Sequence, residues 1–403
     1  MFSFCRGRPP CLPFPNAQIS LVCFTALLLC LPPPLTAQPD LSALDFAAGK
    51  ALFERTWVPA PASTRSADGL GPHYAARSCA ACHANAGRGQ APAAFSLHLN
   101  DPVYGQRLLS LSTAAVPAEV RIEWLPEDSS AGQPLSPAWR FKLNGLTQGE
   151  PSSPISLRVA PSLRGLQWLQ VVPRLTLDAL ADPDDRDGDG ISGRLALLPS
   201  GYVGRFGWKA AVPSLQLQLQ TALALDLGLS NSAFPEPWGD CTAAQSECRA
   251  QALVSADAAA PLEVDATATG LLLSYLSQLP PPAPLPRTEE GEALLRELGC
   301  AACHVPALAS SLGEVKAYSD LLLHDLGPGL DDGLREGAAQ PSEWRTAPLW
   351  ALPPEGPFLH DGRARTLDEA VAWHGGEAQR SRHLYQELDA ERKALLSAFL
   401  LGL

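Results

Sequence analysis

Methionine is nearly absent from this 403-residue chain, which has a single one, Met1. Long apolar runs are missing too, because the stretch ISLVCFTALLLCL (19–31) is shorter than the ~20 residues that cross a bilayer as a helix. Basic residues are outnumbered, with 30 Lys and Arg against 42 Asp and Glu, for a net charge of −12. That charge argues against nucleic acid or an anionic membrane surface as a partner.

The N-terminal segment has the order of a secretory signal peptide. MFSFCRGRPP is basic and has no acidic residue, the apolar run follows, and PPPLTA ends in small residues near Ala37. We predict that residues 1–37 are a signal peptide and that the mature chain is exported to the periplasm without a transmembrane segment. A lipoprotein attached through Cys30 is the alternative, although LLL before it lacks the small residue typical of lipidation sites.

The chain has ten cysteines, and export would leave six of them. Four lie in two copies of the pentapeptide CAACH, at residues 79–83 and 300–304. The other two, Cys241 and Cys248, lie seven residues apart in GDCTAAQSECRA. In an oxidising compartment this spacing predicts a local structural disulfide.

Each CxxCH motif is typical of covalent haem attachment. Two thiols at i and i+3 on one helical turn can reach the two vinyl groups of a haem, and the histidine that follows is then directed at the iron. The alternatives are a zinc site or a redox dithiol, but zinc sites with four cysteines usually pair their CxxC units within ~20 residues. Here 221 positions separate the motifs (300 − 79). We predict two covalent haem c groups, held by Cys79, Cys82 and His83 and by Cys300, Cys303 and His304.

The scarcity of methionine restricts the second axial ligand of each iron. Met1 would leave with the signal peptide, so the mature chain cannot supply the His/Met ligation of ordinary cytochromes c. Histidine, tyrosine, lysine or water remain as candidates for the second axial ligand. Outside the two motifs the histidines are His73, His98, His324, His360, His374 and His383.

Proline marks a boundary inside the mature chain. QLPPPAPLPR (278–287) is typical of a stiff linker, so we predict a haem domain over 38–279, a linker over 280–287 and a second haem domain over 288–403. Apolar residues at helical spacing predict helices in the segments 266–279 and 391–403, and a third over 288–299 that stops directly before the second CxxCH motif.

The first half also has a long middle part with strand-like segments. VRIEWLP (120–126), WRFKLNGL (139–146) and PISLRVA (154–160) read as short strands between turn residues. We therefore expect a mainly α fold of two cytochrome c-type haem domains, of which the N-terminal one carries a β-containing insertion over about residues 100–235.

Several longer motifs carry a resemblance to a known family. GRFGWKA (204–210), DLGLSNSAFPEPWGDCT (226–242), EWRTAPLWAL (343–352) and FLHDGRARTLDEAVAWHGGEA (358–378) resemble the di-haem oxidoreductase/peroxidase family, also labelled thiol oxidoreductase. DRDGDGISGR (185–194) and YSDLLLHDLGPGL (318–330) add to the likeness, which covers most of the mature chain. The family is related to the bacterial di-haem cytochrome c peroxidases.

The resemblance implies roles for residues around the second haem. In the di-haem peroxidases the residue fourteen positions after the histidine of HDG binds the C-terminal iron, and counting from His360 leads to His374. A bis-histidine iron held by His304 and His374 is therefore implied, with a lower potential than a Met-ligated one. His360, beside Asp361 and Arg363, is then expected to support the site or to lie between the haems.

The resemblance makes the N-terminal haem the one that reacts with peroxide. His83 would be its proximal ligand, with the opposite side open or held by a displaceable group. His98, fifteen residues beyond His83, is a candidate for that group, with a purely structural histidine as the alternative, and His73 and Tyr74 are comparable candidates. Trp208 is our candidate for an electron relay.

An acidic loop is a candidate cation-binding site. Asp185, Asp187 and Asp189 alternate before Gly190, a spacing typical of calcium loops, but loop position twelve is Ala196 rather than glutamate, so this is not an EF-hand. The resemblance implies calcium between the haems, and a solvated acidic turn is the alternative.

We therefore expect an enzyme, a peroxidase-like oxidoreductase whose catalytic residues include His83, His360 and Trp208. Electrons would enter through the C-terminal haem from a small periplasmic donor of the cytochrome or cupredoxin type, and the N-terminal haem would reduce hydrogen peroxide or a related oxidant. A di-haem electron carrier or redox sensor without turnover is the alternative, and an iron-acquisition subunit is another. We discount the thiol oxidoreductase label because only the predicted disulfide remains beyond the haem cysteines.

Overall fold

The described part of the chain is built from α-helices and short strands. The structure is a computed structural model that describes residues 41–403 except 65, 126–138, 256–261, 286–287 and 351. The predicted signal peptide and the end of the predicted linker lie outside the described residues. The α-helices are α1 (Leu41–Glu54), α2 (Cys79–Cys82), α3 (Leu166–Gln170), α4 (Arg174–Leu180), α5 (Leu215–Leu227), α6 (Ser246–Ser255), α7 (Ala266–Gln278), α8 (Glu289–Glu297), α9 (Leu367–Trp373), α10 (Gln379–Gln386) and α11 (Ala390–Leu401).

The strands form small antiparallel sheets rather than one large sheet. One three-stranded sheet has the order β3-β2-β7, built from β2 (Phe95–Asp101), β3 (Gly105–Leu108) and β7 (Ser156–Val159). The two-stranded sheets are β1 (His73–Tyr74) with β4 (Leu111–Ser112), β5 (Arg121–Leu125) with β6 (Arg140–Asn144), β8 (Leu308–Ser310) with β9 (Gly313–Val315), and β10 (Leu323–Asp325) with β11 (Glu343–Arg345).

These elements confirm most of the local predictions. Helices α7, α8 and α11 form where the apolar spacing predicts them, and strands β5, β6 and β7 form in the three strand-like segments. More residues lie in helices than in strands, as expected for a mainly α chain. Residues 42–403 form one compact unit, and the boundary at the proline-rich linker stays a prediction.

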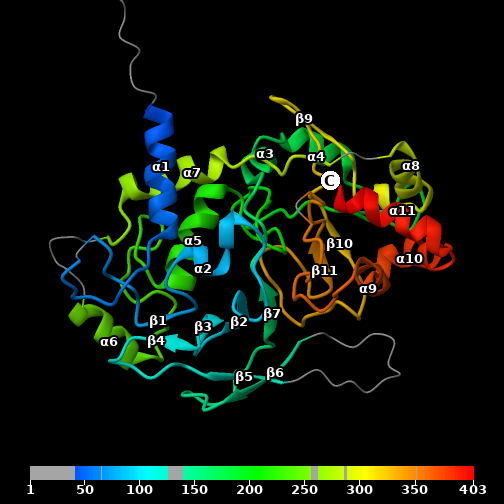
Figure 1. Ribbon diagram of the computed structural model, residues 1–403. Helices are drawn as coiled ribbons and strands as arrows, with labels where there is room; N and C mark the ends of the chain where they lie inside the picture. The colour runs from blue at the N-terminus through cyan, green and yellow to red at the C-terminus, as the bar shows by residue number, and fades with distance from the viewer. Residues whose placement is uncertain (1–40, 65, 126–138, 256–261, 286–287, 351) are drawn as a thin grey trace, which may run out of the picture. The chain divides into compact units, whose positions relative to one another are not determined.

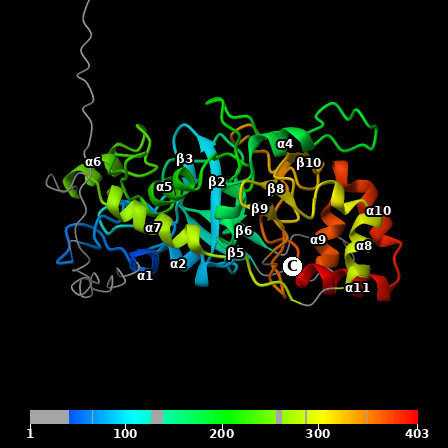
Figure 2. The same ribbon diagram turned by 90° about the horizontal axis from the view of Figure 1, so that it is seen from above.

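The two groups of helices lie on opposite sides of the β3-β2-β7 sheet. Figures 1 and 2 both place α5, α6 and α7 on one side and α8, α10 and α11 on the other. The larger core joins Leu219 and Leu223 of α5 to Leu272 and Leu276 of α7, and Cys79 packs against it. The end of the predicted insertion is therefore part of the wall around the first CxxCH motif.

A second core supports the other CxxCH motif. Helices α8 and α11 pack so closely that a Cβ atom on Gly291 would come within 2.4 Å of the Cβ of Phe399. Leu294, Leu298 and Phe399 are buried there, and Cys300 packs against them. Among the described helices, none is both long and apolar enough to cross a membrane.

Candidate functional site

The first CxxCH motif is held at the start of a short helix. Ser78 caps α2, its Oγ accepting a hydrogen bond from the amide of Ala81 at 3.1 Å. The next residue after α2, His83, has its Nδ1 2.9 Å from the carbonyl oxygen of Pro161. Because a carbonyl can only accept, Nδ1 must donate, and Nε2 keeps its lone pair. Burial lowers the pKa of His83, which favours this neutral, metal-binding form.

The second motif repeats this arrangement. Gly299, with φ of +77°, ends α8 in the left-handed conformation and turns the chain into Cys300. His304 Nδ1 lies 2.9 Å from the carbonyl oxygen of Tyr318, so its Nε2 is likewise available. Burial, together with nearby His374, lowers the pKa of His304 to about 4.

His374 is the second histidine of this site. It follows the last residue of α9, and its Nδ1 lies 2.7 Å from the carbonyl oxygen of Ala370, which leaves Nε2 free. A coulombic interaction with His374 lowers the pKa of His304, so the two side chains lie within electrostatic range of each other. The two histidines that the resemblance assigns to one iron each have Nδ1 beside a backbone carbonyl oxygen, and their joint ligation of an iron stays a prediction.

His83, in contrast, borders a large cavity. A cavity of about 550 Å³ is lined by Cys79, Cys82 and His83, and by apolar side chains of the larger core. This volume lies within the range of about 300–1,000 Å³ usual for ligand and cofactor sites. Its remaining wall includes His98, Trp208, Arg88, Arg158, Arg345 and Glu336.

Cationic side chains at both sites fit a haem, whose two propionates are anionic. Arg88 Nε is buried and has no hydrogen-bond partner among the described residues, and burial lowers the pKa of Arg88 to about 10. Arg345, also on the cavity wall, has its pKa lowered to about 10 by burial. Near His374, Arg382 Nε is likewise buried without a partner in the described part of the chain. Such orphaned donors are costly unless an anion binds them.

Trp208 lies between the cavity and the HDG segment. Its Nε1 donates to the carbonyl oxygen of Val159 at 2.9 Å, and the amide of Val159 donates to the carbonyl oxygen of His360 at 2.7 Å. The guanidinium of Arg88 lies over its ring, 5.2 Å from the centroid. Trp208 is therefore placed at the cavity wall and connected by two hydrogen bonds to His360.

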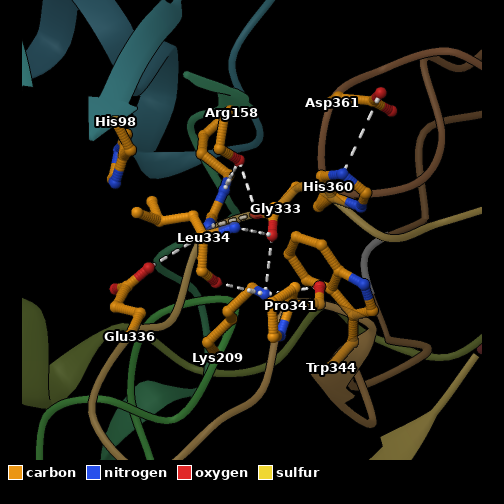
Figure 3. A network of polar contacts seen from close by, with 12 residues as sticks. His98, Arg158, Lys209, Gly333, Leu334, Glu336, Pro341, Trp344, His360 and Asp361 are labelled. Carbon is orange, nitrogen blue, oxygen red and sulfur yellow. Dashed lines mark hydrogen bonds and ion pairs between the residues drawn. The ribbon is translucent and has the colours of Figure 1, made fainter. Parts of the chain in front are cut away.

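His360 is buried in a cationic environment. Its ring stacks on Trp344, with centroids 3.6 Å apart, and its Nε2 lies 3.9 Å from Asp361 (Figure 3). Burial, followed by the charges of Arg158, Arg363, Lys209 and Arg88, lowers the pKa of His360 well below its usual value. The ring is therefore neutral, and His360 does not line the cavity beside His83.

Lys209 and Arg158 form the polar network beside that stack. Lys209 Nζ lies 2.8 Å from Asp332 Oδ1 and donates to the carbonyl oxygens of Leu334 and Pro341. Arg158 Nη2 lies 2.8 Å from Asp332 Oδ2. Figure 3 shows Arg158 beside Glu336, with Arg158 Nη1 3.2 Å from Glu336 Oε2. Lys209 Nζ lies 4.4 Å from the centroid of the Trp344 ring. The sequence motifs do not identify Lys209 and Arg158 as functional residues. Their partner Asp332 lies more than 120 positions away in the chain, so only the folded structure shows the network.

The other candidate ligands of the first haem lie in different places. His98 lines the cavity, with Nε2 3.0 Å from Ser96 Oγ, and burial lowers its pKa well below the usual value. His73 instead contacts Cys241 and Cys248, and the Tyr74 hydroxyl donates to the carbonyl oxygen of Ser112. Of these three candidates, the structure brings only His98 to the cavity.

His324 is an alternative ligand whose nitrogens are already occupied. Nε2 lies 2.8 Å from Asp320 and Nδ1 lies 2.7 Å from Glu377. Burial disfavours the His324 cation, but contacts with Asp320, Cys303 and Glu377 together raise the pKa to about 12. A cation held between two carboxylates does not offer a lone pair to iron.

The predicted calcium loop is a local cluster. Carboxylate oxygens of Asp185, Asp187 and Asp189 lie within 4.8 Å of one another, and the last two side chains are exposed. Backbone amides already donate to each carboxylate, including Gly190 to Asp185 at 3.1 Å. Calcium binding at this loop stays a prediction.

A family model described as "Di-haem oxidoreductase, putative peroxidase" matches residues 35–103 and 152–403. Comparison with curated proteins gave no match. One similar solved structure is the hydrazine synthase of Kuenenia stuttgartiensis, 13% identical, covering 96% of this chain and 100% of that one with a TM-score of 0.34. Another is a MauG-like protein associated with microbial copper homeostasis, 16% identical, covering 59% and 86% with a TM-score of 0.31. TM-scores this low support no inference about this chain.

Proposed function

Because the chain belongs to the di-haem oxidoreductase family, we propose that it is an exported di-haem c-type enzyme that reduces hydrogen peroxide or a related oxidant. Electrons enter at the C-terminal haem, and the oxidant reacts at the N-terminal haem. The observation that carries this proposal is the difference between the two CxxCH histidines. At the C-terminal site His374, which lies within electrostatic range of His304 and has a free Nε2, can supply a second ligand, whereas His83 borders a cavity of about 550 Å³.

That difference assigns separate tasks to the two sites. An iron with two histidine ligands has no open position and is suited to electron transfer, while an iron with one protein ligand in a cavity can bind a small oxidant. When bound, the haems supply the redox chemistry, and the chain sets their ligation, orientation and access. Arg88 and Arg345 at the first site and Arg382 at the second would hold the haem propionates.

A proton donor is also needed beside the oxidant. Glu336 lines the cavity, and its Oε2 atom is buried without a hydrogen bond in the described structure, although Arg158 Nη1 is 3.2 Å away. We assign proton transfer to Glu336: its carboxylate would take a proton from one oxygen of the bound peroxide and return it to the other, with Arg158 holding its position. Trp208 and His360 provide the route between the sites, through the hydrogen bonds of Val159.

The remaining parts of the proposal concern the surroundings of the sites. The electron donor is a small periplasmic protein of the cytochrome or cupredoxin type. We also propose a calcium ion, which the carboxylates of Asp185, Asp187 and Asp189 would hold; its support is the close grouping of these three side chains. Calorimetric titration with calcium tests this point, with Asp187→Asn as the variant expected to bind more weakly.

Spectroscopy of the holoprotein tests the central claim. We expect one low-spin and one high-spin haem in the half-reduced protein, with hydrogen peroxide perturbing only the high-spin signal and an artificial donor being oxidised in turnover. Two low-spin haems without turnover would instead identify an electron carrier or redox sensor.

A further inference from the structure

A buried cluster of four side chains lies apart from the haem sites. His73 comes from β1, Glu119 from the segment after β4, Cys241 from the loop before α6, and Cys248 from α6 itself. Their exposed fractions are 6%, 2%, 5% and 3%, respectively. Within the described chain, none of the four lines the cavity beside His83.

The orientation of the His73 ring is fixed by one hydrogen bond. Nε2 lies 2.9 Å from the carbonyl oxygen of Pro117, and since that oxygen can only accept, Nε2 carries the proton. In the neutral ring, Nδ1 therefore presents a lone pair. This is the orientation of most metal-binding histidines, whose other nitrogen donates to a carbonyl or carboxylate.

The lone pair faces other electron-rich atoms. Nδ1 lies 3.5 Å from Cys241 Sγ and 3.7 Å from Cys248 Sγ, and Glu119 Oε1 lies 3.4 Å from Nδ1. The structure pairs the two sulfurs with each other, and a disulfide has no hydrogen to donate. Burying a histidine and a carboxylate against a disulfide costs free energy that a purely structural bridge does not require.

An ion-pair explanation fits the distances less well. A protonated Nδ1 could donate to Glu119, but charge-assisted N–H···O bonds are usually about 2.7–2.9 Å long, and here the separation is 3.4 Å. Both carboxylate oxygens of Glu119 already accept hydrogen bonds, Oε2 from the amide of Leu109 at 2.7 Å and Oε1 from Gln245 Nε2.

We propose that His73, Cys241 and Cys248, with Glu119 as fourth donor, form a redox-controlled binding site for a thiolate-binding d¹⁰ ion such as Zn²⁺. Nδ1 and the two sulfurs lie within 4.8 Å of one another, and all three are buried. Tetrahedral zinc with bonds of about 2.0–2.3 Å requires ligand atoms about 3.3–3.8 Å apart, close to the observed separations around Nδ1. Pro117, Leu109 and Gln245 orient the ligands from outside.

The site exists only after reduction. A dithiol reductant transfers two electrons and two protons to the Cys241–Cys248 bond and becomes a disulfide itself, leaving two thiols in the protein. Zn²⁺ then displaces the two thiol protons and binds the thiolates. Reoxidation removes the sulfur ligands and releases the ion, so the cluster reports the redox state of its compartment.

Metal analysis of the holoprotein tests this proposal. The protein is reduced with dithiothreitol under anaerobic conditions, desalted, given one equivalent of Zn²⁺ per chain and desalted again. The reduced wild type is expected to keep one zinc per chain, and the oxidised protein none. Bound zinc should also protect Cys241 and Cys248 from alkylation by iodoacetamide, as measured by mass spectrometry.

His73→Gln is the sharpest variant because its amide can still reach Pro117 while the Nδ1 ligand is lost. It should bind zinc at least tenfold more weakly with unchanged haem spectra, and Glu119→Gln should show a smaller loss. Asp187→Asn, in the separate acidic loop, should bind zinc at Cys241 and Cys248 as the wild type does. Resistance of the cysteine pair to dithiothreitol, equal zinc retention in both redox states, or wild-type affinity in His73→Gln would overturn the proposal.

Discussion

His304 and His374 are held in the same way: Nδ1 of His304 lies 2.9 Å from the carbonyl oxygen of Tyr318, Nδ1 of His374 lies 2.7 Å from that of Ala370, and both rings therefore offer an unprotonated Nε2. The two residues are 70 positions apart in the chain (374 − 304). Helix α9 ends directly before His374, and the turn after Gly299 presents His304, so the pairing depends on two helix ends.

Replacing His374 tests this pairing. His374→Ala should leave the C-terminal haem attached but convert its low-spin signal to a high-spin or water-ligated one, because the sixth position opens. His374→Met should stay low-spin with a higher potential, by on the order of 100 mV, a fraction of the ~0.8 V range that axial ligands span. Optical and electron paramagnetic resonance spectra give the spin states, and redox titration gives the potential. A wild-type spectrum in His374→Ala would mean that another residue binds the iron.

The number of covalently attached haems per chain can be measured directly. The denatured wild type should retain two covalent haems per chain in a pyridine haemochrome assay, because each CxxCH motif forms two thioether bonds. Replacing both Cys300 and Cys303 by Ala should leave one haem and preserve the spectrum of the other. One or no covalent haem in the wild type would contradict the assignment of both motifs.

Glu336 can be tested without disturbing ligation. Glu336→Gln keeps the size of the side chain but removes its ability to transfer a proton, so peroxide turnover should fall about 10²- to 10⁴-fold. The spin states and both potentials should stay as in the wild type, since Glu336 is not placed as an iron ligand. Steady-state assays with an artificial donor measure the effect, and unchanged turnover would remove Glu336 from the mechanism.

The cysteine pair should contribute to stability. In the chain-entropy account, closing a loop of this length stabilises the folded state by about 2 to 3 kcal/mol, so Cys241→Ser should lower the free energy of unfolding by that amount. Urea denaturation of the oxidised protein provides the measurement. Unchanged stability together with titratable thiols in the untreated wild type would show that the pair is not bridged.

Asp101 provides a pH-dependent contribution to stability. Burial opposes its charge, but hydrogen bonds from Ser152, Val103 and Tyr104 outweigh burial and lower the pKa of Asp101 to about 2. Since the unfolded pKa is about 3.9, the stabilisation of about 2 kcal/mol is complete above pH 5 and is lost as the pH falls towards 2.

Asp101→Asn should therefore be destabilised by about that amount at pH 7 and should approach the wild type near pH 2 to 3. Urea denaturation at both pH values measures the difference. A constant difference at both pH values would show that the loss comes from packing rather than from the carboxylate charge.

The local features of this protein could be predicted from its sequence. The prediction of covalent haem rests on thiols at i and i+3 and the next histidine, five consecutive residues within about one helical turn, and it stays a prediction. Helices α7, α8 and α11 follow from apolar spacing, and α8 ends at a glycine that can adopt a positive φ. The absence of methionine from the rest of the chain also restricts the axial ligands.

Tertiary structure decided the roles of most other polar residues, because their partners are distant in the chain. The spacing of Cys241 and Cys248 predicts a bridge, but only folding brings β1 and Glu119 beside it. Histidine is a residue type that can bind iron, yet both ring nitrogens of His324 form hydrogen bonds, one with Asp320 and one with Glu377. Such contacts depend on how helices and strands pack, and burial then sets the pKa and the chemistry of each side chain, which sequence spacing alone does not specify.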